Sequence, residues 1–96
     1  MNRQKILEIL RDSKPALEAR YDVTGLTLFG SVARDTAHQD SDVDILVSFD
    51  GPATSKRYFG VLFYLEDRLG CPVDLVTEKA LRRELRPYVE EEQVHV

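Results

Sequence analysis

The sequence has no tryptophan, a single cysteine, and no stripe of Lys and Arg with interleaved aromatic residues. The lone Cys71 excludes an intramolecular disulfide and a CxxC metal site. The missing basic stripe and the net charge of −4 disfavour direct binding of nucleic acid. No apolar run approaches the length of a membrane span, and the N-terminus is too charged for a signal peptide. These absences predict a protein of the reducing cytoplasm with no membrane or nucleic-acid partner.

The length of 96 residues predicts one small domain, residues 1–96. Three short apolar segments read as strands, at residues 26–29, 43–49 and 73–76, and residues 22–25 read as a turn. Helices are expected over the N-terminal segment, where Pro15 kinks or divides the helix, after Ser31, from a cap at Ser55 to Leu69, and after Thr77. The order α-β-α-β-α-β-α predicts an α/β (α+β) fold, a small mixed sheet flanked by helices.

The charged and aromatic residues of the segment from Ser55 onward have an ordinary interpretation. Helical spacing places Phe59 and Phe63 with the leucines of that helix, so they are expected in the core. Its basic residues, Arg57 among them, are expected on a helix face in water.

Three carboxylates interrupt apolar strands. Asp42 and Asp44 lie two residues apart and therefore on one face of a strand, roughly 6–7 Å apart along the chain. Asp74 lies within the apolar segment that forms the third predicted strand. Carboxylates are seldom buried unless they are paired or bind a metal, and hard oxygen ligands suit Mg²⁺, which usually binds together with substrate phosphates. The pattern predicts a metal-dependent phosphoryl- or nucleotidyl-transfer site.

A glycine-serine pair precedes these acids. Gly30 ends an apolar strand, and Ser31 begins a predicted helical turn. Glycine lets the backbone approach a phosphate, and free N–H groups at a helix start attract anions. Arg34 could reach phosphates from the same turn or could be a solvated helix residue. Neither a P-loop nor a dinucleotide fingerprint is present.

Residues 30–34 (GSVAR) and 41–47 (SDVDILV) together resemble the nucleotidyltransferase superfamily that includes polymerase beta. More closely, they resemble the minimal nucleotidyltransferases, the partners of HEPN toxins, and the similarity covers nearly the whole chain. The resemblance implies that three acids form the catalytic and metal site, namely Asp42, Asp44 and Asp74. It also implies nucleotide binding by Gly30, Ser31, Arg34 and Ser41. The family often has glycine where this chain has Asp35.

The resemblance implies a Mg²⁺-dependent transfer of AMP from ATP to a hydroxyl, expected to be that of a tyrosine, of a partner HEPN toxin. The chain would then act as an antitoxin within a hetero-oligomer. Because the predicted catalytic domain accounts for the whole chain and no second domain is expected, a partner is expected to supply the acceptor. Two alternatives stay open: an antitoxin that neutralises its partner by occlusion with a relic site, and a small-molecule transferase of the aminoglycoside-modifying kind.

Overall fold

A computed structural model describes residues 3–30, 43–78 and 94–96 of the chain. The elements are listed here in chain order: α1 (Arg3–Tyr21), β1 (Val23–Phe29), β2 (Val43–Phe49), α3 (Ser55–Leu69), β3 (Val73–Thr77) and β4 (Val94–His95). The two further helices expected from the sequence fall on residues outside these ranges. Within the described ranges, neither helix is long and apolar enough to cross a membrane.

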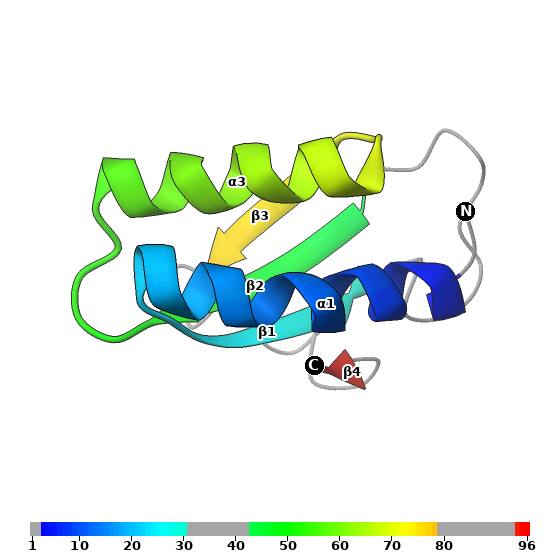
Figure 1. The fold of residues 1–96 in the computed structure, drawn as a ribbon, viewed down its shortest axis with the longest axis horizontal. Coiled ribbons are helices and arrows are strands. Elements are labelled where there is room, and N and C mark those ends of the chain that lie inside the picture. The colour runs from blue at the N-terminus through cyan, green and yellow to red at the C-terminus, as the bar shows by residue number, and fades with distance from the viewer. Residues whose placement is uncertain (1–2, 31–42, 79–93) are drawn as a thin grey trace.

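The strands form one mixed sheet in the order β3-β2-β1-β4. β1 is antiparallel to both β2 and β4, whereas β2 and β3 are parallel and are connected through α3. Figure 1 shows α1 and α3 lying side by side over the sheet. The predicted fold class, a small mixed sheet flanked by helices, is confirmed.

The main core lies between the helices and one face of the sheet. Alternate residues of β2, namely Val43, Ile45 and Val47, are all at most 2% exposed and pack in this core. Since successive strand residues point to opposite faces, Asp44 and Leu46 belong to the other face. There Leu46 forms a separate small apolar cluster with Phe29. The alternation of β2 therefore puts aliphatic side chains under the helices and Asp44 on the face opposite to them.

The N-terminal helix continues through Pro15 without a break. Proline removes one helical hydrogen bond and crowds the preceding turn, which is why a kink or a division was expected. Leu10 and Leu17 flank Pro15, and both are fully buried in the main core. Nearby, the buried Ser13 hydroxyl donates to the Ile9 carbonyl at 2.7 Å, so it adds no unsatisfied polar group. We attribute the continuity of α1 to core packing on both sides of the proline.

The expected turn at residues 22–25 is confined to Asp22, which has a φ of 58°. β1 already begins at Val23, which is 3% exposed, and its register with β2 shifts between Val23 and Gly25. A bulge of this kind lets the strand start early while Val23 still enters the core. The sequence prediction was therefore wrong for Val23 to Gly25.

The fourth strand was not predicted. In β4, Val94 and His95 pair with Leu28 and Thr27. The Thr27 hydroxyl and His95 Nδ1 are 2.9 Å apart, and Lys14 Nζ donates to the Val96 carbonyl at 2.9 Å. Two strand residues are too few to show an alternating pattern, so the pairing is invisible in the sequence.

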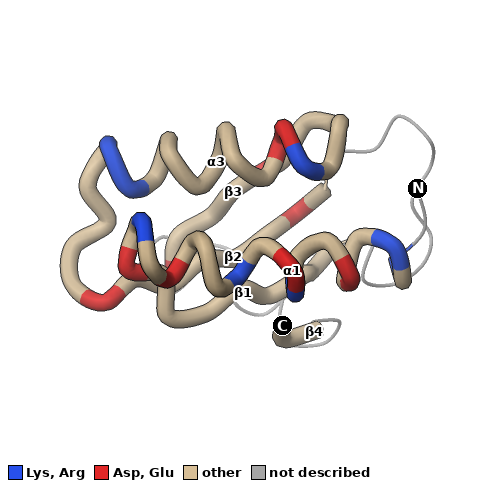
Figure 2. Tube along the Cα trace, viewed as in Figure 1, with Lys and Arg blue, Asp and Glu red and all other residues tan. Residues whose placement is uncertain are grey.

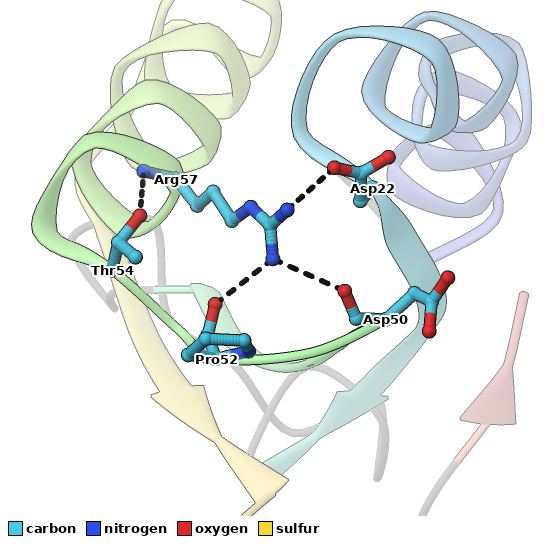
Figure 3. Close-up of polar contacts among 5 residues, drawn as sticks. All are labelled: Asp22, Asp50, Pro52, Thr54 and Arg57. Atoms are coloured by element: carbon cyan, nitrogen blue, oxygen red, sulfur yellow. Dashed lines mark hydrogen bonds and ion pairs between the residues drawn. The ribbon is translucent and has the colours of Figure 1, made fainter.

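An arginine organises the start of α3. Thr54, rather than the expected Ser55, caps the helix by accepting a hydrogen bond from the Arg57 backbone N–H. The Arg57 guanidinium pairs with Asp22 at 2.6 Å and donates to the carbonyls of Asp50 and Pro52 (Figure 3). Arg57 thus joins the ends of α1 and β2 to α3, and its assignment to a solvated helix face was wrong.

The two phenylalanines of α3 are not in the core. Phe59 is 48% exposed and Phe63 is 62% exposed, whereas Val61, Leu65 and Leu69 form the buried side of the helix. At about 100° per residue, the buried side lies across the helix axis from Phe63. Helical spacing identified α3 correctly but did not show which of its apolar residues would face the sheet.

Candidate active site

The site begins at the junction between Gly30 and Asp44. Phe29, the last residue of β1, pairs with Asp44 of β2, and Gly30 follows with a φ of 73°. A Cβ atom on Gly30 would overlap the Asp44 carboxylate and would lie 2.9 Å from its Cγ. Glycine is therefore required here twice, once for the backbone conformation and once for space. The Asp44 side chain occupies the volume that any other residue at position 30 would need.

On its other side, Asp44 has a second acid as its neighbour. Asp44 and Asp74 are register partners in the parallel β2–β3 pair. Neighbouring strands lie about 4.8 Å apart, and paired residues project to the same face. A hydrogen bond of 3.2 Å from the Val43 N–H to the Pro72 carbonyl closes the pair just before the two acids. Gly30, Asp44 and Asp74 therefore form one row: Gly30, which follows β1, lies against Asp44, and the sheet pairs Asp44 with Asp74.

The two acids differ in their exposure to solvent. Asp44 is half-buried and Asp74 is exposed. The expectation that the carboxylates replace core residues is thus wrong for Asp74, because the face that carries it is not the face covered by α1 and α3. The other proposed site residues lie outside the described residues, and these are Ser31, Arg34, Ser41 and Asp42.

The donor set suits a hard divalent cation. Two carboxylates on adjacent strands can share an ion, and the missing Cβ of Gly30 leaves the space that the Asp44 carboxylate occupies. In the described part of the chain, no three metal-ligating side chains form a group. Asp44 and Asp74 could therefore supply two ligands, and a third protein ligand would have to come from outside the described residues.

A comparison with known families shows to which family this chain belongs. The family profile described as "Nucleotidyltransferase domain" matches residues 4–95. This chain belongs to the nucleotidyltransferase domain family. Protein adenylyltransferase MntA of Thermococcus cleftensis is 38% identical to it over 93 residues, which are 97% of this chain and 94% of that protein. The resemblance to minimal nucleotidyltransferases, stated above from residues 30–34 and 41–47, is confirmed.

Solved structures agree with the assignment. A structure described as a minimal nucleotidyltransferase superposes on this nucleotidyltransferase with a TM-score of 0.79 and 36% identity, over 98% of this chain and 95% of the other. A toxin–antitoxin structure with AMP-PNP superposes with a TM-score of 0.66 and 28% identity, over 99% of this chain and 72% of the other. Both the fold and the enzyme class of the chain are thereby shown.

Two side chains that sequence reasoning missed attach α3 to the strand that carries Asp74. Among the strands that the structure describes, β3 lies at the edge of the sheet, so its outward backbone groups have no strand partner there. The Tyr58 hydroxyl donates to the Leu75 carbonyl at 2.6 Å, and the Glu66 carboxylate accepts from the Val73 N–H at 3.1 Å. These bonds lie on either side of Asp74. Tyr58 and Glu66 thus fix the backbone of β3 before and after Asp74.

The surroundings of Tyr58 keep its hydroxyl protonated. Burial raises the pKa of Tyr58 above its ordinary value of 10.0, and the nearby charge of Asp74 raises it further. The neutral form is the one that donates to the Leu75 carbonyl. Because the folded-state pKa is the higher one, this contribution to stability is fully present below the unfolded pKa and is lost as the pH rises through the folded value. The sequence signal was weak: two polar residues eight apart lie on the same side of a helix.

Tyr58→Phe should lower the free energy of unfolding by about 1 kcal/mol, since it leaves the Leu75 carbonyl without its donor. Nucleotide transfer should fall mainly in kcat, because β3 and Asp74 would be less well fixed while nucleotide contacts elsewhere persist. Urea unfolding and steady-state kinetics measure the two effects. Above pH 10 the difference in stability between the two proteins should shrink.

Glu66 offers a matched pair of variants for the same test. Glu66→Gln keeps an acceptor oxygen for the Val73 N–H and should retain kcat, whereas Glu66→Ala should behave like Tyr58→Phe. Equal kcat in all four proteins would show that these bonds stabilise β3 without positioning Asp74.

A hollow of about 540 Å³ lies at the opposite ends of β2 and β3 from the acids. Its lining includes Ser48, Thr77 and Glu78, together with the loop that precedes α3. It lies away from Asp44 and Asp74, which stand near the beginnings of their strands. The row of Gly30, Asp44 and Asp74, rather than this hollow, is the candidate active site.

Proposed function

We propose that this nucleotidyltransferase transfers AMP from ATP to a tyrosine hydroxyl of a partner HEPN toxin and thereby acts as its antitoxin. The observation that supports a working enzyme is the position of Asp44, which lies against Gly30 on one side and pairs with Asp74 of the adjacent strand on the other. A carboxylate pair suited to Mg²⁺, with a glycine that gives one of the two carboxylates room, is a part that nucleotidyl transfer requires. The domain proposed to carry this activity is the whole of residues 1–96.

The proposed roles follow from the chemistry of each group. Backbone at Gly30 would lie against the triphosphate, with Ser31, Arg34 and Ser41 proposed as further nucleotide contacts. Asp44 and Asp74, together with Asp42, would hold Mg²⁺, which when bound would offset the negative charge of the triphosphate.

Asp74 is the proposed proton acceptor because it is the more exposed of the two described acids. The acceptor oxygen forms a bond to the α-phosphorus of ATP, and the bond from that phosphorus to the pyrophosphate oxygen breaks. The hydroxyl proton passes to the Asp74 carboxylate, and pyrophosphate leaves. An exposed carboxylate at the edge strand is open to a hydroxyl presented by another protein.

The partner is proposed from the relatives of the chain. The relative MntA carries the name protein adenylyltransferase, and the AMP-PNP-bound structure with a similar fold is a toxin–antitoxin structure. These names support ATP as the nucleotide source and a toxin as the acceptor. A hetero-oligomer of nucleotidyltransferase and toxin is therefore part of the proposal.

Asp74→Asn tests the proposed reaction. The chain would be incubated with its HEPN partner, ATP and Mg²⁺, and intact-mass spectrometry would count AMP units on the partner. We expect wild type to add at least one AMP to a tyrosine, and Asp74→Asn to lose most of kcat while its affinity for ATP changes little. A variant that loses ATP affinity but reacts normally at saturation would reverse the assigned role.

Neutralisation of the toxin by occlusion, without AMP transfer, predicts a different result. If Asp74→Asn and the wild type silence the toxin equally at equal concentrations of complex, then the neutralisation comes from binding alone. If AMP appears on a small molecule and never on the partner, the acceptor class is wrong although the enzyme class stands.

A further inference from the structure

The outer side of α3 carries an exposed aromatic pair. Phe59 and Phe63 are the exposed large hydrophobic residues among those described, and their rings stack with centroids 5.9 Å apart and planes 25° apart. They lie on the side of α3 away from the core residues Val61 and Leu65. Stacked phenyl rings left in water are costly, and such patches commonly mark interaction sites.

Charged residues extend the aromatic pair at both ends. Lys56 precedes Phe59 by three residues and Asp67 follows Phe63 by four, so the four side chains fall within about 80° of one another around the helix. All four are exposed. We call the set Lys56, Phe59, Phe63 and Asp67 the α3 outer stripe.

The two charges of the stripe have signs that the helix dipole disfavours at their ends of α3. Lys56 lies in the first turn and Asp67 in the last turn, where the helix dipole favours the opposite signs (Figure 2). The neighbouring charges Arg57 and Glu66 make ion-pair or backbone contacts within the fold. Lys56 and Asp67 make no hydrogen bond or ion pair with any residue that the structure describes. Nothing inside the described fold explains their placement.

We propose that the α3 outer stripe binds the α3 outer stripe of a second copy of this chain, antiparallel, about a two-fold axis. The stripe is self-complementary in this orientation. The midpoint between Phe59 and Phe63 and the midpoint between Lys56 and Asp67 both fall near the level of Val61 along the helix axis. A two-fold axis through that point stacks four phenyl rings at the centre. It also brings each Lys56 opposite the Asp67 of the other copy, which is the isologous arrangement of symmetric dimers.

The area of the contact determines how strong the dimer is, and its position determines whether the candidate active sites stay accessible. One helix stripe buries less than the roughly 1,200 Å² of a standard interface, so the dimer is weak and depends on concentration. Asp44 and Asp74 lie on the sheet face opposite to the helices. Both active sites therefore remain open, facing away from the dimer axis.

Sedimentation velocity over a concentration series tests the proposal with charge-reversed variants. Lys56→Glu alone and Asp67→Lys alone should each be monomeric, because each places like charges opposite one another twice in the dimer. An equimolar mixture of the two variants should regain the dimer, since both contacts then join a Glu or Asp to a Lys. Both reversals agree with the helix dipole, so neither should unfold the protein, as circular dichroism would verify.

Further variants complete the test. Phe59→Ser with Phe63→Ser should abolish self-association, and Asp12→Lys, a reversal on the exposed side of α1, should leave it unchanged. A wild type that stays monomeric at every concentration overturns the proposal. So does a mixture of the two charge variants that fails to associate, or a toxin that binds wild type but not the Phe59→Ser/Phe63→Ser variant while the free chain stays monomeric.

Discussion

Asp44→Asn is expected to abolish nucleotide transfer while leaving the fold as stable as wild type or more so. Asp44 is the central residue of the row, beside Gly30 on one side and Asp74 on the other. Replacing a metal-ligating carboxylate by an amide should reduce kcat/KM by more than the 10–100-fold typical of losing an outer-shell partner. Removing one of two neighbouring negative charges relieves repulsion in the metal-free protein. Transfer of AMP to the partner, followed by mass spectrometry, measures the loss.

Asp50→Asn is the matched control for this variant. Asp50 directly follows the same strand, and its backbone carbonyl, which Arg57 contacts, is unaffected by the substitution. It removes one negative charge from the same strand at the end away from the acid pair. Asp50→Asn should keep full activity, and comparable losses in the two variants would indicate an effect of overall charge instead of a metal site at Asp44.

Gly30→Ala should lose both stability and activity. Alanine at a φ of 73° costs about 1–2 kcal/mol, and its Cβ would displace the Asp44 carboxylate as well. The displaced carboxylate should weaken Mg²⁺ binding and reduce kcat. Chemical denaturation gives the first effect, and isothermal titration with Mg²⁺ and a non-hydrolysable ATP analogue, together with kinetics, gives the second.

Gly70→Ala separates the effect of the backbone conformation from the effect of displacing the Asp44 carboxylate. Gly70 caps α3 with a φ of 70°, and a Cβ there would meet nothing within 4 Å. This variant should show the same loss of stability from the backbone conformation and no loss of activity. Should Gly30→Ala match Gly70→Ala in activity, then the space beside Asp44 has no catalytic importance.

The fold was predicted from the sequence wherever the spacing of apolar residues indicates which side chains are buried. The strand at Val43–Phe49 was predicted with the bounds that the structure shows, and the helix that ends at Leu69 was predicted with its cap one residue late, because alternation and helical spacing are strong there. The early start of β1 at Val23 and the two-residue β4 depend on pairing with distant strands. Local patterns contain no information about such partners.

The residues of the candidate site were predictable from the sequence. The way in which they are held in space was less predictable. Gly30, Asp44 and Asp74 were identified from their positions in or next to apolar strands, and the register places them together. The supporting hydrogen bonds of Tyr58 and Glu66 were not foreseen, since they depend on where α3 crosses the sheet edge. The exposure of Phe59 and Phe63 was missed for the same reason.

The hydrogen bonds from α3 to β3 also bear on how the protein resists aggregation. An edge strand with free backbone groups can add strands from other molecules, which begins cross-β growth. Here the Glu66 carboxylate occupies the Val73 N–H and the Tyr58 hydroxyl occupies the Leu75 carbonyl, so two outward groups of β3 are already bonded. A foreign strand would have to displace both side chains before it could pair. The two hydrogen bonds on either side of Asp74 therefore also protect one rim of the sheet against strand addition.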